Sequence, residues 1–249
     1  MKFKFISINI WLGGKLFDNL VEFIQRENPD ILALQEVHNG KGKLPRNLKT
    51  IEEFKKKFNF EYISFAPAYL NVTPNGKIPS GNSIFSKFPI KEDKITFTSS
   101  LFEEQTFEKR KTWDSVPRNL QHTKINISDK ILNIFNTQGI WGKDDMDNPE
   151  RLKMSQKIVK EIKGKENVIL CGDFNVGVNT KTIKNIEKYL VNIFPKRATS
   201  FNLRRKTGGG FKSSVVDFVF TSQDIEVIQK YVPEVDVSDH MPLIAIFEL

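Results

Sequence analysis

Short apolar runs recur along this chain, and an acidic or amide side chain follows several of them. Residues 3–10 and 31–34 form two such runs, which end near Asn9 and Gln35-Glu36. Residues 16–27 lie between them and carry apolar side chains at helical spacing. Two strands joined by one helix make a β-α-β unit. The chain therefore opens as an α/β protein whose strands end in polar groups.

The rest of the chain continues this mixture, with more strands than helices. Further strands are expected at residues 60–65, 83–86, 94–98, 120–127, 131–136, 168–171, 215–220, 226–231 and 243–247. Further helices are expected at residues 51–58, 147–164 and 180–190. Residues 100–117 show no period and are expected to form an irregular loop. Without a repeat or linker, we expect a single domain over residues 1–249.

The chain is strongly basic. Its 249 residues carry a formal net charge of +8, and the pI is near 9.4. A positive charge of this size favours a polyanionic partner, such as nucleic acid or an anionic membrane surface. A lysine-rich composition without functional meaning explains the charge equally well. Nucleic acid is therefore an expected partner, and residues that could bind it are needed to support this expectation.

No segment predicts secretion or a membrane span. The N-terminus alternates apolar and polar residues and lacks the small-residue cleavage site of a signal peptide. No apolar run approaches the roughly 18 residues that a spanning helix needs. The single cysteine, Cys171, lies in an apolar run and is expected to be a small core residue. We expect a monomeric, cytoplasmic protein.

The polar groups at the strand ends suit a metal ion. They are Asn9, Glu36, Asp173, Asn175, Asp217 and Asp239. Loops at strand ends gather into a cleft in open α/β folds, so these side chains are expected to converge. Their oxygen atoms suit a hard divalent cation such as Mg²⁺, and thiolate and imidazole ligands for zinc are nearly absent. Taken singly, each acid is more often a turn or helix cap.

His240 is a candidate of a second kind, because it directly follows Asp239. A carboxylate beside an imidazole can hold it protonated, and Asp217 or Asp239 is expected to supply that charge. A protonated imidazole stabilises negative charge on a phosphoryl oxygen. His122 falls within an expected strand and is expected to be packed.

A series of short segments, in this order along the chain, carries a resemblance to a known family. The segments are Ser7-Ile8-Asn9, Leu34-Gln35-Glu36, Ser80-Gly81-Asn82-Ser83-Ile84-Phe85-Ser86, Gly172-Asp173-Phe174-Asn175, Val216-Asp217-Phe218-Val219-Phe220 and Ser238-Asp239-His240. Each segment alone is weak evidence, but the ordered series spans nearly the whole chain. The chain resembles the endonuclease/exonuclease/phosphatase superfamily, which includes deoxyribonucleases, apurinic-site endonucleases, neutral sphingomyelinases and inositol-polyphosphate phosphatases.

The resemblance implies a fold, a reaction and a cofactor. The fold would be a four-layered α/β sandwich of the DNase I-like kind, in which two mixed β-sheets pack face to face and are flanked by helices. The reaction would be hydrolysis of a phosphate ester, with phosphodiester bonds in nucleic acid as the leading prediction. The cofactor would be Mg²⁺ or Mn²⁺, with Glu36 as the principal ligand, Asn9 close by, and Asp239 as a further ligand or its support.

The resemblance also gives roles to the other matched residues. Asp173 would orient or deprotonate the attacking water, and Asn175 would hold that water or the phosphate. Asp217 would orient His240, which would bind the scissile phosphate. Gln138 is a departure, because many relatives have at this position a histidine that contacts phosphate and can protonate the leaving group. Glutamine gives no proton, so a metal-bound water does that work, or the leaving group is a good one, or activity is reduced.

Basic residues outside these segments are candidates for substrate contacts. Residues 196–212 contain Arg204 and Arg205 and no acid, and a basic loop of this kind can grip a phosphate backbone. An exposed loop without a function explains the same composition equally well. Arg118 precedes an expected strand and is a candidate phosphate clamp.

Three aromatic residues lie beside the same segments in the sequence. They are Trp11, Trp141 and Phe211, and each can stack on a base. Burial in a core is the commoner fate of tryptophan, so both interpretations stay open.

Two other functions also stay open. One is a phosphatase or phosphodiesterase that acts on a small or lipid-derived phosphate ester. The other is a degenerate binding module that kept the fold and lost turnover through Gln138. Ionic strength separates a nuclease from the first of these, because contacts with a nucleic-acid backbone weaken steeply with salt.

Overall fold

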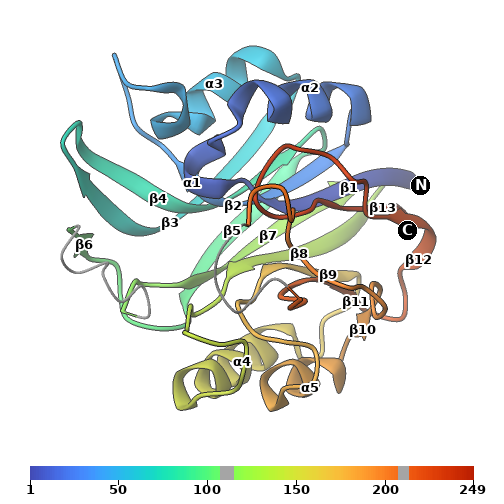
Figure 1. Ribbon diagram of the computed structural model, residues 1–249. Coiled ribbons are helices and arrows are strands. Elements are labelled where there is room, and N and C mark those ends of the chain that lie inside the picture. The colour runs from blue at the N-terminus through green and yellow to red at the C-terminus, as the bar shows by residue number, and fades with distance from the viewer. Residues whose placement is uncertain (107–114, 207–212) are drawn as a thin grey trace.

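The structure is a computed structural model that describes residues 1–106, 115–206 and 213–249. Its strands form two mixed sheets, one of seven strands and one of six, which pack face to face (Figure 1). Helices lie on the outer face of each sheet, above and below in Figure 1. This arrangement is the four-layered DNase I-like sandwich, so the predicted fold class is confirmed.

The first sheet contains the β-α-β opening of the chain. Its strands, in order across the sheet, are β12 (Glu226–Tyr231), β13 (Leu243–Glu248), β1 (Lys2–Asn9), β2 (Ile31–His38), β4 (Gly76–Ser86), β3 (Tyr62–Thr73) and β6 (Glu104–Gln105). β1 runs parallel to β2 and antiparallel to β13. The helices on this side are α1 (Trp11–Gly14), α2 (Phe17–Glu27) and α3 (Thr50–Lys57), with a short 3-10 helix, η1 (Arg46–Leu48).

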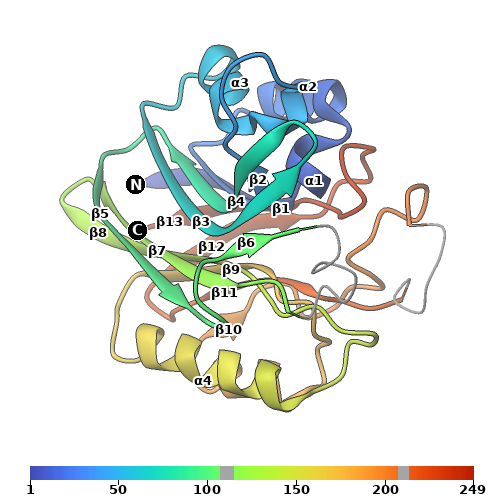
Figure 2. The ribbon, with the colours of Figure 1, turned by 90° about the vertical axis from the view of Figure 1, so that its left-hand side faces the viewer.

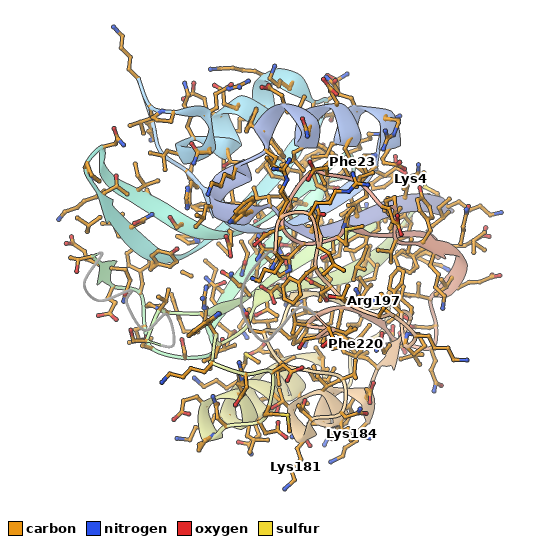
Figure 3. All side chains as sticks on the ribbon, viewed as in Figure 1. Lys4, Phe23, Lys181, Lys184, Arg197 and Phe220 are labelled. Atoms are coloured by element: carbon orange, nitrogen blue, oxygen red, sulfur yellow. The ribbon has the colours of Figure 1, made fainter. Side chains whose placement is uncertain are left out.

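The second sheet holds the remaining strands. In order they are β10 (Val191–Asn192), β11 (Asp217–Thr221), β9 (Val168–Asp173), β8 (Lys130–Gln138), β7 (Asn119–Ile127) and β5 (Ile90–Phe97). α4 (Pro149–Ile162) and α5 (Lys181–Glu187) lie on its outer face, and Figure 2 shows α4 running across that face. Lys181 and Lys184 of α5 are exposed and point away from the sheet in Figure 3, so the opposite side of this helix faces the core.

Both faces of the central strands are buried, which explains their continuous apolar runs. In β1, Phe3 and Phe5 join the core between the two sheets, whereas Ile6 and Ile8 pack with residues of α2 and α3. Cys171 belongs to the core between the sheets, where burial raises the pKa of its thiol to about 12. The prediction that Cys171 is a small core residue is confirmed.

The chain around residues 66–82 is more regular than the sequence predicts. β3 and β4 form one long hairpin that extends well beyond the expected strands at 60–65 and 83–86. A register shift between Pro67 and Tyr69 accommodates the proline, which has no backbone N–H to donate. The expectation of an irregular loop was also wrong at Glu104–Gln105, which pairs with β3 as β6. Residues 107–114 lie outside the described residues.

Within the described part of the chain, no helix is long and apolar enough to cross a membrane. The single domain, the monomeric state and the cytoplasmic location stay predictions.

Candidate active site

Several strand ends meet at one edge of the sandwich and enclose a cleft of about 330 Å³. Asn9 ends β1, Gln138 ends β8 and Asp173 ends β9. Strand pairing places Asp173 opposite both Gln138 and Asp217. The predicted site residues that line the cleft are Glu36, Arg118, Gln138, Trp141, Asp173, Asn175, Asp239 and His240. Side chains from the beginning, middle and end of the chain therefore converge here.

The backbone at Glu36 is strained where it enters the cleft. β2 is bulged at this point, and Glu36 has a φ of 60°, in the left-handed region. Its carboxylate accepts hydrogen bonds from the Leu12 backbone N–H at 2.7 Å and from the Gln138 amide at 2.9 Å. Burial alone would raise the pKa of Glu36, but the hydrogen bonds from Leu12 and Asn9 and the charge of His240 lower it below its usual value. Glu36 is therefore a carboxylate prepared to hold a cation.

The side-chain amide of Asn9 connects two carboxylates. Its Nδ2 donates to Glu36 Oε1 at 3.0 Å and to Asp173 Oδ2 at 3.1 Å. Its Oδ1 accepts the backbone N–H of Trp11 at 3.0 Å, which fixes the direction of the amide. The geometry therefore supports an orienting role for Asn9, while the second lone pair of Oδ1 leaves its assignment as a metal ligand a prediction.

Asp173 and Asn175 form the next part of the cleft. Asp173 is buried and accepts hydrogen bonds from the Asn175 backbone N–H at 3.0 Å and from its side-chain amide at 3.3 Å. Asn175 has a φ of 53°, which asparagine tolerates better than most residues. Burial, together with the charge of Asp217, raises the pKa of Asp173 to about 6. A carboxyl group with such a pKa can accept a proton near neutral pH.

His240 and Asp217 form a buried pair. Nδ1 of His240 lies 2.9 Å from Asp217 Oδ2. Burial alone would lower the pKa of His240, but the charge of Asp217 and its hydrogen bond, with the charges of Asp173 and Asp239, raise it to about 10. The imidazole is therefore protonated at neutral pH. Its Nε2–H remains as a donor for an anion in the cleft.

Asp239 adds a third carboxylate to the lining of the cleft. It is largely buried and forms an ion pair with Lys206, whose Nζ lies 4.0 Å from Asp239 Oδ2. Burial raises the pKa of Asp239, and the negative charge of Glu36 raises it further. A dication between Glu36 and Asp239 would relieve this repulsion.

Arg118 and Gln138 are hydrogen-bonded to each other inside the cleft. Arg118 Nη1 donates to Gln138 Oε1, and Gln138 Nε2 donates to Glu36 Oε1 at 2.9 Å. Burial lowers the pKa of Arg118, but an arginine stays charged at any ordinary pH. Both ends of the Gln138 amide are thus engaged by protein groups. Through Gln138, the charge of Arg118 is held close to Glu36.

The sequence identifies only part of the cleft wall. Trp11 and Trp141 both line the cleft, but so do Tyr69 and His38, which no sequence motif marks as site residues. His38 follows Glu36 by two residues on the same strand, and the two-residue period of a strand is the signal that points to it. Tyr69 lies in the part of β3 that the sequence does not predict.

Arg204 and Arg205 do not line the cleft. Arg205 forms an ion pair with Asp236, with Nε 2.7 Å from Oδ1. Arg204 lines a separate depression that, among the described residues, shares only Phe201 with the cleft. Lys206 of the same basic segment does line it, whereas residues 207–212, including Phe211, lie outside the described residues. Substrate binding by Arg204 and Arg205 stays a prediction without support from this geometry.

Residues 6–240 match the model of the Endonuclease/Exonuclease/phosphatase family. The chain belongs to this family. None of the curated proteins is significantly similar to it in sequence. Members of the family are phosphoesterases, so the reaction class that the membership supports is hydrolysis of a phosphate ester.

Solved structures share the fold over the whole chain at low identity. A family member from Bacteroides vulgatus is 16% identical with a TM-score of 0.72, covering 100% of this chain and 99% of that chain. The mannosyl-6-phosphatase of Bacteroides thetaiotaomicron is 17% identical with a TM-score of 0.68, covering 99% and 100%. D. rerio TDP2 complexed with a single-strand DNA product is 16% identical with a TM-score of 0.70, covering 100% and 99%.

The donor set of the cleft is compatible with the divalent metals that the family generally uses. Among the described residues, Asp173, Asp217 and His240 have ligand atoms that all lie within 4.8 Å of one another. Within this group the carboxylate oxygens are compatible with a cation, whereas His240, whose Nδ1 is bonded to Asp217, can offer Nε2–H to an anion such as phosphate. Glu36 and Asp239 offer carboxylate oxygens with free lone pairs, which suit a hard cation.

Proposed function

We propose that this protein is a divalent-metal-dependent hydrolase of phosphodiester bonds and that nucleic acid is its substrate class. The observation that carries the reaction is the meeting of Glu36, Asp173 and the His240–Asp217 pair in one cleft. The three parts supply a cation-holding carboxylate, a carboxyl group that can accept a proton, and a buried positive charge. Phosphoryl transfer depends on this combination of placement and charge neutralisation.

Glu36 and Asp239 would hold the metal ion. Bound Mg²⁺ or Mn²⁺ would neutralise negative charge on the reacting phosphate. The protein prepares this position by fixing the Glu36 carboxylate with hydrogen bonds from Leu12, Asn9 and Gln138. Groups that orient metal ligands in this way set both affinity and geometry.

The other side chains bind the phosphate and activate water. His240 donates from Nε2 to a phosphate oxygen, and Arg118 adds a second positive charge. Asp173 accepts the proton of the attacking water, which the Asn175 side-chain oxygen orients. As the water oxygen bonds to phosphorus, the ester P–O bond breaks and the leaving oxygen takes its proton from a second water molecule. Gln138 holds Arg118 and Glu36 in place and contributes no proton.

Nucleic acid is favoured by the composition of the cleft wall. Trp11, Tyr69 and Trp141 line the same cleft as the cations Arg118 and Lys206. Aromatic faces for bases together with cations for the backbone are the usual way to bind a single strand. The net charge of +8 supports the same substrate class, because it attracts a polyanion.

A small phosphate ester is the second candidate substrate. The cleft volume of about 330 Å³ supports it, because a cleft of this size accommodates one small ligand. The same fold in the mannosyl-6-phosphatase of Bacteroides thetaiotaomicron is consistent with such a substrate. The roles of Glu36, Asp173 and His240 would be unchanged, and only the group beyond the phosphate would differ.

Hydrolysis assays on the purified protein test the proposal. Single-stranded DNA, RNA and sugar monophosphates would each be incubated with Mg²⁺, with Glu36→Gln as the inactive control. We expect cleavage of oligonucleotides, with an apparent affinity whose logarithm falls linearly with the logarithm of salt concentration. Hydrolysis of sugar phosphates alone would support the second candidate. Oligonucleotide binding without cleavage would contradict the proposed activity and indicate an inactive binding module.

A further inference from the structure

The segment from Gly139 to Asn148 connects β8 to α4 and forms one wall of the cleft. It carries Trp141 and Gly142, which both line the cleft, and contains no helix or strand. Its shape therefore cannot come from a regular ladder of backbone hydrogen bonds. Contacts with the rest of the protein must hold it.

Arg151 holds this segment by hydrogen bonds from its buried side. It lies in the first turn of α4, is only 1% exposed, and is the largest of the fully buried side chains among the described residues. Its Nε donates to the Ile140 carbonyl at 3.1 Å, and its Nη1 donates to the Met146 carbonyl. Because one rigid guanidinium holds both carbonyls, it fixes the two ends of the stretch that contains Trp141 and Gly142.

Gly142 lies directly against the guanidinium. A Cβ atom at this position would come within 2.6 Å of Arg151 Nη2, closer than real Cβ contacts allow. Nη2 is buried and has no hydrogen-bond partner among the described residues. The charge is offset in part by Asp144, whose Oδ1 lies 3.6 Å from Nη1. Gly142 and the Arg151 guanidinium therefore pack directly against each other on the buried side of the cleft wall.

The same segment is joined to the loop that follows Asp173. The Gly139 carbonyl accepts a hydrogen bond from the Asn175 amide at 3.2 Å, and the Asp145 carbonyl accepts one from the Gly177 backbone N–H at 2.7 Å. Hydrogen bonds therefore hold the cleft wall from two sides, through the loop that follows Asp173 and through Arg151.

We propose that Arg151 is a positioning residue that determines where Trp141 stands in the cleft, and thereby how well the cleft binds the base next to the scissile phosphate. The inference rests on the proposed function. Arg151 itself is not among the residues that line the cleft, so it acts through the segment from Gly139 to Asn148 that it holds. Its loss weakens substrate binding more than it slows the chemical step.

Arg151→Lys is the first test, because lysine keeps the charge but its single ammonium cannot hold both carbonyls in the same geometry. We expect KM for a single-stranded oligonucleotide to rise on the order of tenfold while kcat stays close to that of the wild type. Ser155→Ala is the matched control, since Ser155 is buried on the same helix but its hydroxyl bonds Leu152 and Asn185, away from the cleft wall. An unchanged KM in Arg151→Lys, or an equal rise in Ser155→Ala, would overturn the proposal.

A second readout does not depend on activity. The chain has three tryptophans, and labelling with 5-fluorotryptophan gives each a ¹⁹F NMR signal, with that of Trp141 assigned from Trp141→Phe. Arg151→Lys and Gly142→Ala should both shift the Trp141 signal and leave the Trp11 signal in place. Gly142→Ala keeps the arginine, so it carries the test if Arg151→Lys does not fold.

The two proposals fail in different ways. If the protein hydrolyses no phosphate ester, the proposed function is wrong, and the NMR experiment still decides the role of Arg151. If both variants leave the Trp141 signal unchanged, Arg151 does not position this wall, whatever the substrate.

Discussion

The side-chain amide of Asn9 lies 3.1 Å from a carboxylate oxygen of Asp173, although 164 residues separate them. Asn9 ends a strand of the seven-stranded sheet and Asp173 ends a strand of the six-stranded sheet. The hydrogen bond therefore crosses between the two sheets. A second bond from the same amide reaches Glu36, so one side chain fixes both carboxylates. The geometry of the site depends on how the sheets pack.

Replacing Asn9 by alanine should leave the fold intact and disturb this arrangement. We expect kcat/KM to fall by about 10–100-fold and the apparent affinity for Mg²⁺ to weaken, as is typical when a group that orients metal ligands is removed. Steady-state kinetics over a range of Mg²⁺ concentrations measures both effects.

Asn133→Ala is the matched control for Asn9→Ala. Asn133 lies in the first half of β8, away from Gln138 at its end, and bonds His122 and the Glu166 carbonyl. Equal losses in the two variants would mean that the effect is general destabilisation and not the loss of the bridge between Glu36 and Asp173.

His240→Ala should reduce activity more than Asn9→Ala does, because it removes the buried positive charge itself. We expect kcat to fall by about 10²–10³-fold, the range seen when one donor to a developing anion is removed. Asp217→Asn should reduce kcat less than His240→Ala does. The asparagine can keep the 2.9 Å hydrogen bond with His240, although it removes the charge that keeps His240 protonated. A His122→Gln variant with normal kcat is the control. A fully active His240→Ala protein would rule out the proposed phosphate-binding role.

Removal of divalent metal should abolish hydrolysis, and Mg²⁺ or Mn²⁺ should restore it. The same metals should raise the melting temperature of the wild-type protein, because a ligand that binds only the folded state stabilises it. Glu36→Gln should remove both the activity and this stabilisation while keeping a side chain of the same shape. Metal-dependent stabilisation that survives in Glu36→Gln would place the metal elsewhere.

Local patterns predict an α/β chain whose polar strand ends converge, and the family resemblance adds the four-layered fold and the roles of the matched residues. Asp173 and Asp217 each lie at a strand end, and strand pairing brings them together as expected. The link from Arg118 to Gln138 depends on the register between β7 and β8, which no local pattern reveals.

What local patterns do not show also has physical causes. Arg205 lies in a basic segment, but its ion pair with Asp236, 31 residues away in sequence, cannot be read from that segment. Tyr69 was missed because Pro67 interrupts the strand pattern, and the register shift that accommodates the proline is a property of the paired sheet. Arg151 looks like an ordinary charged helix residue, and only its burial reveals what it holds.

His122 lies away from the cleft and shows how burial changes the protonation of an imidazole. Its ring stacks on Phe135 at 4.1 Å, and Nε2 lies 2.9 Å from Asn133 Oδ1, which confirms that this residue is packed. Burial lowers the pKa of His122, although the hydrogen bond to Asn133 opposes the shift. The unfolded chain, in which the pKa is about 6.5, therefore takes up this proton at a higher pH than the folded protein.

The stability contribution of neutral His122 should thus be complete above about pH 6.5 and should be lost as the pH falls toward the lower folded-state pKa. Urea unfolding of the wild type and of His122→Gln, from about pH 7.5 to about pH 5.5, measures this contribution as the difference between their free energies of unfolding. Other titrating groups act in both proteins and cancel in the difference. We expect the advantage of the wild type to shrink as the pH falls. A difference that does not depend on pH would show that His122 has the same pKa in the folded and unfolded states.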